Sequence, residues 1–311
     1  MTTGVVLMTY GSPRDLDDVA AYITRVRGGR APDEGLLAEF RRRYQRIGMS
    51  PLISITAQQA SALDARLGHD FRVAAGMRFS EPSVRHAVRE LGLVERILGL
   101  ILSPQYSATL MGGYHQALSQ AAGVLPCRTV GAWHLNPAFI DVLASRIRAG
   151  LAAFPPGVRD AVPVLLTAHS LPKRVVEREP DYVEQLKETA RAVAAAADLG
   201  PDRWFFVYQS AGHTPEEWLK PDMLDVLPEL AAAGHRDVVV APVQFLADHL
   251  ETLYDVDVAG REQAEQAGFS SFARIAAPNA APDFIQALAN VVRGELAAWA
   301  AASRGARWAT V

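Results

Sequence analysis

The sequence predicts an α/β fold made of two doubly wound lobes, each built on a parallel sheet. Three observations favour this fold. Short runs rich in β-branched residues recur along the chain, turn residues bound them, and helix-compatible amphipathic stretches separate them. Apolar runs of this kind are typical of parallel strands buried on both faces. Four of the runs fall in each half of the 311 residues, and at about 150 residues per domain this length favours two domains.

Eight runs are the predicted strands, and a helix is predicted at the end of the chain. The strands are Val5–Thr9, Arg72–Gly76, Ile97–Leu102, Arg128–Trp133, Val162–Ala168, Trp204–Tyr208, Val238–Val243 and Ser271–Ile275. We divide the chain into an N-terminal lobe, residues 1–140, and a C-terminal lobe, residues 141–311, although no residue-level repeat relates them. The last helix, about residues 282–303, has apolar residues at helical spacing, and we expect it to pack back on a lobe.

Composition narrows the class of partner and the compartment. The formal net charge is -3 and the isoelectric point is about 6.3, so the chain lacks the basic surface that nucleic acid or an anionic membrane requires. Cys127 is the only cysteine, which excludes an intramolecular disulfide and fits a reducing cytoplasm. The chain opens on a strand-like run without the features of a signal peptide, and its apolar runs are too short to cross a bilayer. We therefore expect a cytoplasmic protein with a small-molecule partner and no integral membrane association.

A histidine follows the fifth predicted strand. The run Leu165–Ala168 leads directly to His169, and a Leu-Pro break follows two residues later. In open α/β sheets, ligands bind in the crevice outside the carboxyl ends of the strands, so His169 is predicted to face a cleft. Taken alone, the same pattern also fits a histidine that caps a helix or bonds a carbonyl.

An acidic segment follows the seventh predicted strand. It reads Asp248-His249-Leu250-Glu251-Thr252-Leu253-Tyr254-Asp255-Val256-Asp257. In an α-helix, Glu251 and Asp255 would share one face at i and i+4, while the core side would hold Leu250, Leu253 and Tyr254. Like charges at this spacing destabilise a helix unless they share a cation or a proton, so the pattern suits delivery of a divalent metal or removal of protons. The alternative is a solvated acidic helix face.

An aromatic hydroxyl and a group of arginines lie near the N-terminus. Tyr10 follows the first predicted strand, and the next predicted helices contain Arg25, Arg27, Arg30, Arg41, Arg42 and Arg43. Arginine binds carboxylates with two parallel hydrogen bonds. Most of these arginines are expected to form a hydrated helix face with Glu34 and Glu39, and one or two are enough to bind an acidic ligand.

Taken together, these segments resemble the ferrochelatases, and more narrowly the short coproporphyrin ferrochelatases of bacteria. The resemblance runs from Val5 to the final helix and follows the family's order and approximate spacing. It rests on Ala168-His169-Ser170-Leu171-Pro172, Tyr208-Gln209-Ser210, Trp218-Leu219 with Pro221-Asp222, and Asp248-His249-Leu250-Glu251 with Leu253-Tyr254 and Asp257.

The resemblance implies two Rossmann-like lobes of the chelatase type with a porphyrin cleft between them. The implied activity is insertion of Fe²⁺ into a porphyrin, with coproporphyrin III as the expected substrate. Three alternatives stay open: insertion of iron into protoporphyrin IX, non-catalytic binding of porphyrin or haem, and insertion of cobalt or nickel into another tetrapyrrole.

The resemblance also implies roles for particular residues. His169 and Glu251 would be the catalytic pair and, with Tyr10 on the opposite face, the ligands of the metal, while Asp255 would lead the metal inward. The implied substrate contacts are Tyr10, Arg27, Arg43, Tyr44, Ser50 and Tyr114. Iron is a substrate here and no permanent cofactor is implied, because Cys127 alone cannot ligate the iron–sulfur cluster of some actinobacterial relatives. A monomer with transient protein partners in the haem pathway is expected.

Four positions depart from the family pattern. Ala259 stands where relatives often have an acidic residue beyond Asp255, so the outer carboxylate that an accessory metal site there would use is missing. Gln244 stands where a glycine is common. Gly28 and Phe79 occupy positions that are arginine and histidine in some relatives, which weakens one expected contact to a propionate and leaves the role of that histidine unfilled.

Overall fold

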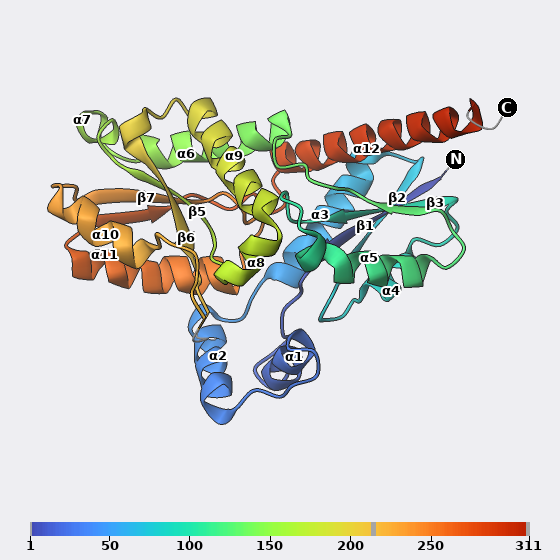
Figure 1. The fold of residues 1–311 in the computed structure, drawn as a ribbon, viewed down its shortest axis with the longest axis horizontal. Coiled ribbons are helices and arrows are strands. Elements are labelled where there is room, and N and C mark those ends of the chain that lie inside the picture. Colours follow the sequence, from blue (N-terminus) through green and yellow to red (C-terminus); the bar gives the residue numbers. More distant parts are fainter. Residues whose placement is uncertain (1, 213–215, 309–311) are drawn as a thin grey trace.

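The computed structural model describes residues 2–212 and 216–308, and its centre is a pair of four-stranded parallel sheets (Figure 1). The first sheet has the order β2-β1-β3-β4 and the second the order β6-β5-β7-β8, so both follow the same topology when each is counted from its own first strand. The strands of the first sheet are β1 (Thr3–Thr9), β2 (Phe71–Met77), β3 (Arg96–Ile101) and β4 (Cys127–Thr129). Those of the second are β5 (Val164–His169), β6 (Trp204–Gln209), β7 (Asp237–Pro242) and β8 (Ser271–Arg274). All eight predicted strands are confirmed, and β4 is shorter than predicted.

The central strands are buried on both faces, as their apolar runs predict. In β1, Val5 and Leu7 face one hydrophobic cluster while Val6 and Met8 face another, because successive side chains of a strand point to opposite faces. The same division separates neighbouring residues in β7, such as Val238 and Val239. The cluster that contains Val5 and Val239 extends over both sheets, so the two lobes share one continuous core.

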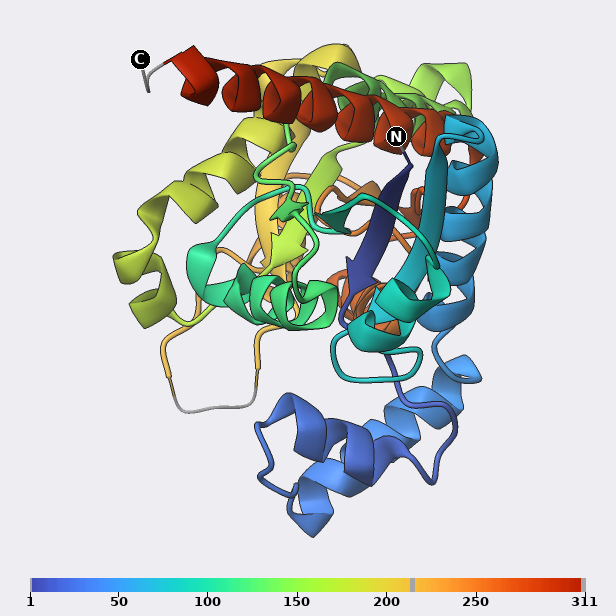
Figure 2. The same ribbon diagram turned by 90° about the vertical axis from the view of Figure 1, so that its right-hand side faces the viewer.

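Five helices belong to the N-terminal part. They are α1 (Val19–Val26), α2 (Glu34–Ile47), α3 (Leu52–Leu67), α4 (Val84–Glu90) and α5 (Ala108–Ala122). Helix α2 begins where the Asp33 side chain accepts a hydrogen bond from Leu36 N, and it ends at Gly48 with φ +71°. Helices α1 and α2 project away from the two sheets as a separate pair (Figure 2).

The remaining helices surround the second sheet and return to the first. They are α6 (Pro137–Ala152), α7 (Pro156–Arg159), α8 (Lys173–Arg178), α9 (Pro180–Ala196), the short 3-10 helix η1 (Pro201–Arg203), α10 (Met223–Ala232), the π-helix η2 (Glu251–Gly260), α11 (Arg261–Ala267) and α12 (Pro282–Trp308). The predicted division after residue 140 falls within α6. Within the described residues, no helix combines the length and the hydrophobicity that a membrane span requires.

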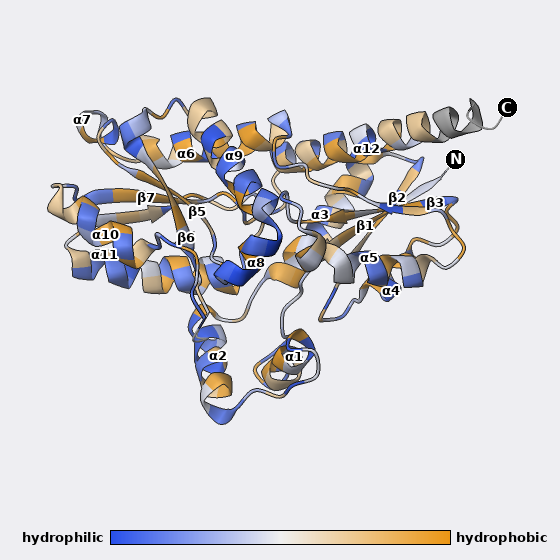
Figure 3. Cartoon of the chain, in the orientation of Figure 1, coloured by the Kyte–Doolittle hydropathy of each residue, from blue (hydrophilic) through white to orange (hydrophobic). Residues whose placement is uncertain are grey.

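Helix α12 packs against both α3 and α6, and so lies across the two lobes (Figures 1 and 2). Its apolar residues, among them Phe284 and Leu288, are buried in the shared core, while polar residues interrupt the apolar ones along its length (Figure 3). Arg146 of α6 bonds Asp283 at the start of α12 with distances of 2.8 and 3.0 Å. The chain therefore closes one side of the molecule with its last helix.

Candidate active site

The imidazole of His169 faces the carboxylate of Glu251. Strand β5 ends at His169, η2 begins at Glu251, and His169 Nε2 lies 3.7 Å from Glu251 Oε1. The other ring nitrogen, Nδ1, contacts the carbonyl oxygen of Ser170. Because a carbonyl only accepts, Nδ1 carries the proton in the neutral ring, and Nε2 is left as the basic atom. Both side chains are about one-third exposed, at 29% and 31%, so a ligand has access to the pair.

Glu251 also lies next to a second imidazole. Its Oε2 is 3.7 Å from Nε2 of His249, whose ring packs on Phe245. Burial has the largest effect on the pKa of Glu251 and raises it, but His169 and His249 together lower it to about 2. The carboxylate therefore stays ionised at neutral pH. No role was predicted for His249 from the sequence. Its position two residues before Glu251 is the feature that could have indicated a contact between the two side chains.

The segment that begins at Glu251 is a π-helix and not the α-helix in which Glu251 and Asp255 would share one face. A π-helix has i→i+5 hydrogen bonds and a wider turn, so it presents a different set of side chains to the core. Leu250 and Tyr254 are buried as predicted, but Leu253 is only partly buried, and Thr252 and Val256 are fully buried instead. π-Helices are rare, and most of them are single-turn bulges that are frequent at functional sites.

Asp255, the residue predicted to lead metal inward, is paired with Arg43. Arg43 Nη1 lies 3.1 Å from Asp255 Oδ1, and the same guanidinium lies over the ring of Tyr254. Burial raises the pKa of Asp255 most strongly, a hydrogen bond from Ser210 and the charge of Arg43 lower it, and Glu251 raises it, so that the net shift is upward. Ser210 has φ +58°, an unfavourable backbone region for a residue other than glycine. A residue predicted to bind substrate and a residue predicted to guide metal thus contact each other.

Tyr10 lies within electrostatic reach of Glu251 although it follows a strand of the other sheet. It follows β1, is 44% exposed, and packs its ring on Phe79 with centroids 4.6 Å apart. Burial raises the pKa of Tyr10, Arg78 lowers it and Glu251 raises it, with a net upward shift. Phe79 supplies an aromatic surface where some relatives are expected to have histidine.

Arg78 is a site residue that the sequence analysis missed. Its guanidinium lies 4.8 Å from the ring centre of Phe79 and 5.3 Å from that of Tyr114, and it donates to the carbonyl of Leu110 at 3.2 Å. Its effect on Tyr10 places a cation beside that phenol. The signal that could have found it is its position directly after β2, at the same carboxyl edge of the sheet as Tyr10.

The other predicted substrate contacts fall into two groups. Tyr44 and Tyr114 are buried, at 3% and 6% exposed, and burial raises the pKa of both. The hydrogen bonds described for the remaining two residues are local. Arg27 donates to Ala31 O at 3.0 Å, and Ser50 Oγ accepts from Leu52 N at 3.4 Å. Ala259 packs with the apolar cluster of α1, α2 and η2, and its methyl side chain cannot bind a metal ion.

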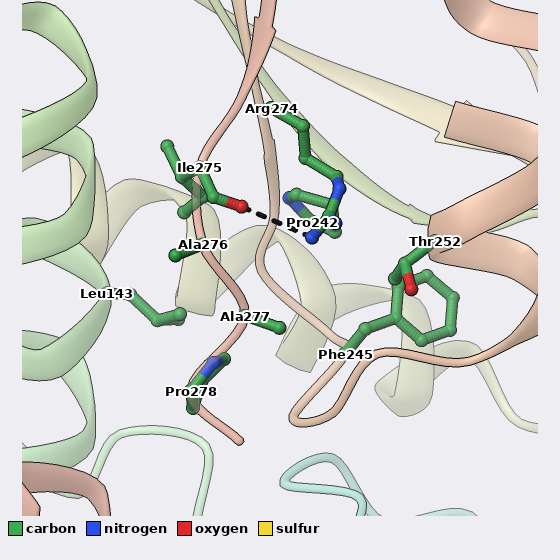
Figure 4. A pocket seen from close by; sticks show the side chains of 9 residues that line it. All are labelled: Leu143, Pro242, Phe245, Thr252, Arg274, Ile275, Ala276, Ala277 and Pro278. Carbon is green, nitrogen blue, oxygen red and sulfur yellow. Dashed lines mark hydrogen bonds between the residues drawn. The ribbon is translucent and has the colours of Figure 1, made fainter. Parts of the chain in front are cut away.

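Two hollows lie outside the residues of the candidate site. An enclosed cavity of about 10 Å³, the size of one water molecule, lies beside the start of η2 (Figure 4). Figure 4 shows Phe245, Thr252 and Arg274 converging on it, with Arg274 bonded to the carbonyl of Ile275. An open hollow of about 310 Å³ lies between residues 130–136 and α12. Neither is lined by His169, Glu251 or Tyr10, so both are separate from the candidate site.

The arrangement combines a base, an anion and a phenol. Among the described residues, no group of three His, Cys, Asp or Glu side chains is placed to hold a metal ion together. The site instead offers His169 Nε2 as a base, ionised Glu251 beside it, and Tyr10 from the opposite lobe. Such a set can take protons from a ligand while a cation approaches the carboxylate.

Comparison with known proteins agrees with this chemistry. A family model described as ferrochelatase matches residues 2–296. The ferrochelatase of Herpetosiphon aurantiacus is 38% identical over 304 residues, covering 94% of this chain and 99% of that protein. The coproporphyrin III ferrochelatases of Geobacillus kaustophilus and Bacillus subtilis are 36% and 34% identical; each match covers 94% of this chain, and 95% and 97% of the respective relative.

Solved structures of low sequence identity share the fold. CbiX, described as the terminal enzyme of sirohaem biosynthesis in denitrifying bacteria, superposes with a TM-score of 0.51 at 14% identity, over 94% of this chain and 99% of its own. SirB from Bacillus subtilis with Fe³⁺ superposes with a TM-score of 0.57 at 12% identity, over 94% and 95%. These likenesses bear out the two Rossmann-like lobes. The family model and the relatives above show that the chain belongs to the ferrochelatase family.

Proposed function

We propose that the protein inserts Fe²⁺ into coproporphyrin III and releases Fe-coproporphyrin. The observation that carries the proposal is the pair formed by His169 Nε2 and the ionised Glu251, 3.7 Å apart and accessible. Metallation replaces two pyrrole N–H protons by one dication. The site must therefore accept protons and attract a cation at the same place, and this pair supplies both functions.

In the proposed reaction, His169 Nε2 accepts the two pyrrole protons one after the other and passes each to solvent, to which its side chain is 29% exposed, and Glu251 stabilises the imidazolium that forms each time. Each proton leaves a nitrogen lone pair on the macrocycle, and that lone pair binds Fe²⁺, so two protons are released for each iron inserted. A flat macrocycle directs its lone pairs inward, so contacts that favour a bent ring accelerate the step. The imidazole acts as a base only in its neutral form.

Support for coproporphyrin III comes from the relatives and from the cations near the site. Two of the relatives above are named coproporphyrin III ferrochelatases, and the expected match at Tyr10 points the same way. Coproporphyrin has more propionate groups than protoporphyrin. We propose that those carboxylates bind guanidinium groups on the N-terminal side, namely Arg78, Arg27 and Arg43, the last of which is also paired with Asp255.

The conditions of the reaction follow from the same proposal. The activity belongs in a reducing cytoplasm, because the iron must stay ferrous and Cys127 is the only cysteine. A single thiol also cannot ligate an iron–sulfur cluster, so we propose catalysis without one. The protein would act as a monomer that meets other proteins of haem synthesis transiently.

The test is anaerobic insertion of Fe²⁺, followed by loss of the free-porphyrin spectrum, with coproporphyrin III and protoporphyrin IX. His169→Ala and Glu251→Gln should each lower the rate by about 100-fold or more, the usual range for a lost base or its partner. His235→Ala, on the loop after α10, is the matched control and should keep the native rate. Faster turnover of protoporphyrin IX would overturn the choice of substrate.

The same assay separates the other candidate functions. Tight binding of porphyrin without metallation would favour a carrier, which needs an axial ligand such as Tyr10 but no base beside a carboxylate. Because His and carboxylate ligands do not by themselves select iron, Co²⁺ and Ni²⁺ belong in the metal panel. Preference for either of them would overturn the choice of metal.

A further inference from the structure

The side chain of Gln244 joins three elements behind the His169–Glu251 pair. Its Oε1 accepts a hydrogen bond from the backbone N–H of His169 at 2.7 Å, and its Nε2 donates to the hydroxyl of Tyr182 at 2.6 Å. His169 ends β5, Tyr182 belongs to α9, and Gln244 itself lies on the segment that leads from β7 to Glu251. We propose that Gln244 is a positioning residue that holds the backbone of His169 in register with Glu251 and so sets the geometry of metal insertion. This inference rests on the proposed function.

The first argument comes from the hydrogen bonds between β5 and β7. The two strands pair in parallel as far as Thr167 and Pro242, with Val239 N donating to Pro163 O and Val243 N donating to Thr167 O, both at 3.0 Å. The next bond of this alternating pattern would join His169 N to the carbonyl of Val243. The chain turns after Pro242, however, and the amide oxygen of Gln244 stands in for that carbonyl.

The second argument concerns what else holds His169. On the β6 side, His169 is aligned with Gln209, and Ser170 N donates to Gln209 O at 2.7 Å. On the β7 side, the backbone N–H of His169 donates its hydrogen bond to Oε1 of Gln244. Backbone donors inside proteins are nearly always paired, so loss of this acceptor should let the end of β5 shift. A shift there moves Nε2 relative to the carboxylate of Glu251.

The third argument is that Gln244 is itself anchored. Tyr182 is 4% exposed and packs with Ala168 and Leu186, so its ring is held by the core. Burial raises the pKa of Tyr182, which keeps the phenol neutral and able to accept from Nε2 of Gln244. The amide is therefore fixed at one end by α9 and at the other by β5.

The test compares variants that remove one contact at a time. Gln244→Ala removes both contacts, and Gln244→Asn is one methylene too short to span them. Gln244→Glu keeps the acceptor for His169 N and can accept from the hydroxyl of Tyr182, while Tyr182→Phe removes only the anchor. The matched control is Gln105→Ala, because Gln105 is also buried and donates to Thr189 on the same helix at 2.8 Å without contacting His169.

Four quantities would be measured for each folded variant: kcat, KM for Fe²⁺, Kd for coproporphyrin III, and hydrogen exchange of the peptide that contains His169. We expect Gln244→Ala and Gln244→Asn to lower kcat by about 10- to 100-fold with Kd nearly unchanged, because a small misplacement of a reacting group costs up to about that much. Exchange at His169 should become faster in both. Gln244→Glu should recover most of kcat, and Tyr182→Phe should lie between the native protein and Gln244→Ala.

Each outcome decides one of the two proposals. Native kcat in Gln244→Ala and Gln244→Asn would overturn the positioning role, and so would an equal loss of kcat in Gln105→Ala. If Gln244→Ala does not fold, Gln244→Asn and Tyr182→Phe still give the comparison. Failure of the native protein to metallate any porphyrin would overturn the proposed function. In that case, hydrogen exchange still tests Gln244: unchanged exchange at His169 in Gln244→Ala and Gln244→Asn would reject its structural role as well.

Discussion

Arg43 and Asp255 form an ion pair between the N-terminal helix α2 and the π-helix η2, with Nη1 3.1 Å from Oδ1. Both side chains are mostly buried, at 17% and 16% exposed, and the two residues are 212 positions apart in the chain. Arg43 is also within hydrogen-bond distance of Glu39, one turn earlier in α2. Through Arg43, the carboxylate of Asp255 therefore connects η2 of the C-terminal lobe to α2 of the N-terminal lobe.

Asp255→Asn should weaken the supply of metal to the site. The neutral amide no longer attracts a dication, so KM for Fe²⁺ should rise about tenfold, a change equal to about 1.4 kcal/mol. The affinity for coproporphyrin III should stay within about twofold of the native value. The measurement is the initial rate as a function of Fe²⁺ at saturating porphyrin. Glu262→Gln, an exposed carboxylate of α11, is the control, and an equal rise of KM in both variants would contradict the prediction.

Glu251 should make stability depend on pH in the acid range. Its pKa is about 2 in the folded protein, against 4.5 for the ordinary group, so the folded state binds this proton less readily than the unfolded state. The contribution is fully present above about pH 4.5 and is lost as the pH falls toward 2. The difference in urea-unfolding free energy between the native protein and Glu251→Gln should therefore shrink between pH 6 and pH 3. Glu265→Gln, an exposed carboxylate of α11, is the control. A difference that stays constant with pH would show that Glu251 has no lowered pKa.

Arg78→Met should weaken porphyrin binding. Arg78 lies over Tyr114 and beside Tyr10, so its loss removes a cation from the N-terminal side of the site while methionine keeps much of the apolar contact. We expect Kd for coproporphyrin III to rise about tenfold, within the range for a hydrogen bond to a charged group. Fluorescence quenching of the porphyrin measures this change. Arg72→Met, at the other end of β2, should bind normally, and a similar loss of affinity there would rule out a local role for Arg78.

Arg274→Met should destabilise the segment that carries Glu251. The guanidinium of Arg274 is bonded to Asp257 at 2.8 Å and to Asp248 at 3.0 Å, so it ties both flanks of Glu251 to β8. Removing one partner of a largely buried ion pair usually costs about 3 kcal/mol or more in unfolding free energy. Urea unfolding measures that loss. The control is Arg261→Met, since Arg261 donates to Phe272 O and lies over its ring without pairing to either aspartate.

Local patterns in the sequence predicted most of the fold. Apolar runs separated by helix-compatible stretches predicted all eight strands and the C-terminal helix. A strand buried on both faces of a parallel sheet is a continuous apolar run, and such a run can be recognised without knowing which strands lie beside it. The same reasoning placed His169 at the end of β5. The pairing of His169 with Glu251 came from the resemblance to a family, and the structure places the two side chains together.

Tertiary structure decided the features that depend on distant partners. The π-helix at Glu251–Gly260, the pairing of Arg43 with Asp255, and the position of Arg78 over Tyr114 each depend on contacts that no local period encodes. Gln244 is the clearest case, since its amide completes a strand ladder only because β7 turns at that point. Periodicity reports which face of an element is buried, whereas the partner of a polar side chain is set by how separate elements pack, and that packing exists only in the folded chain.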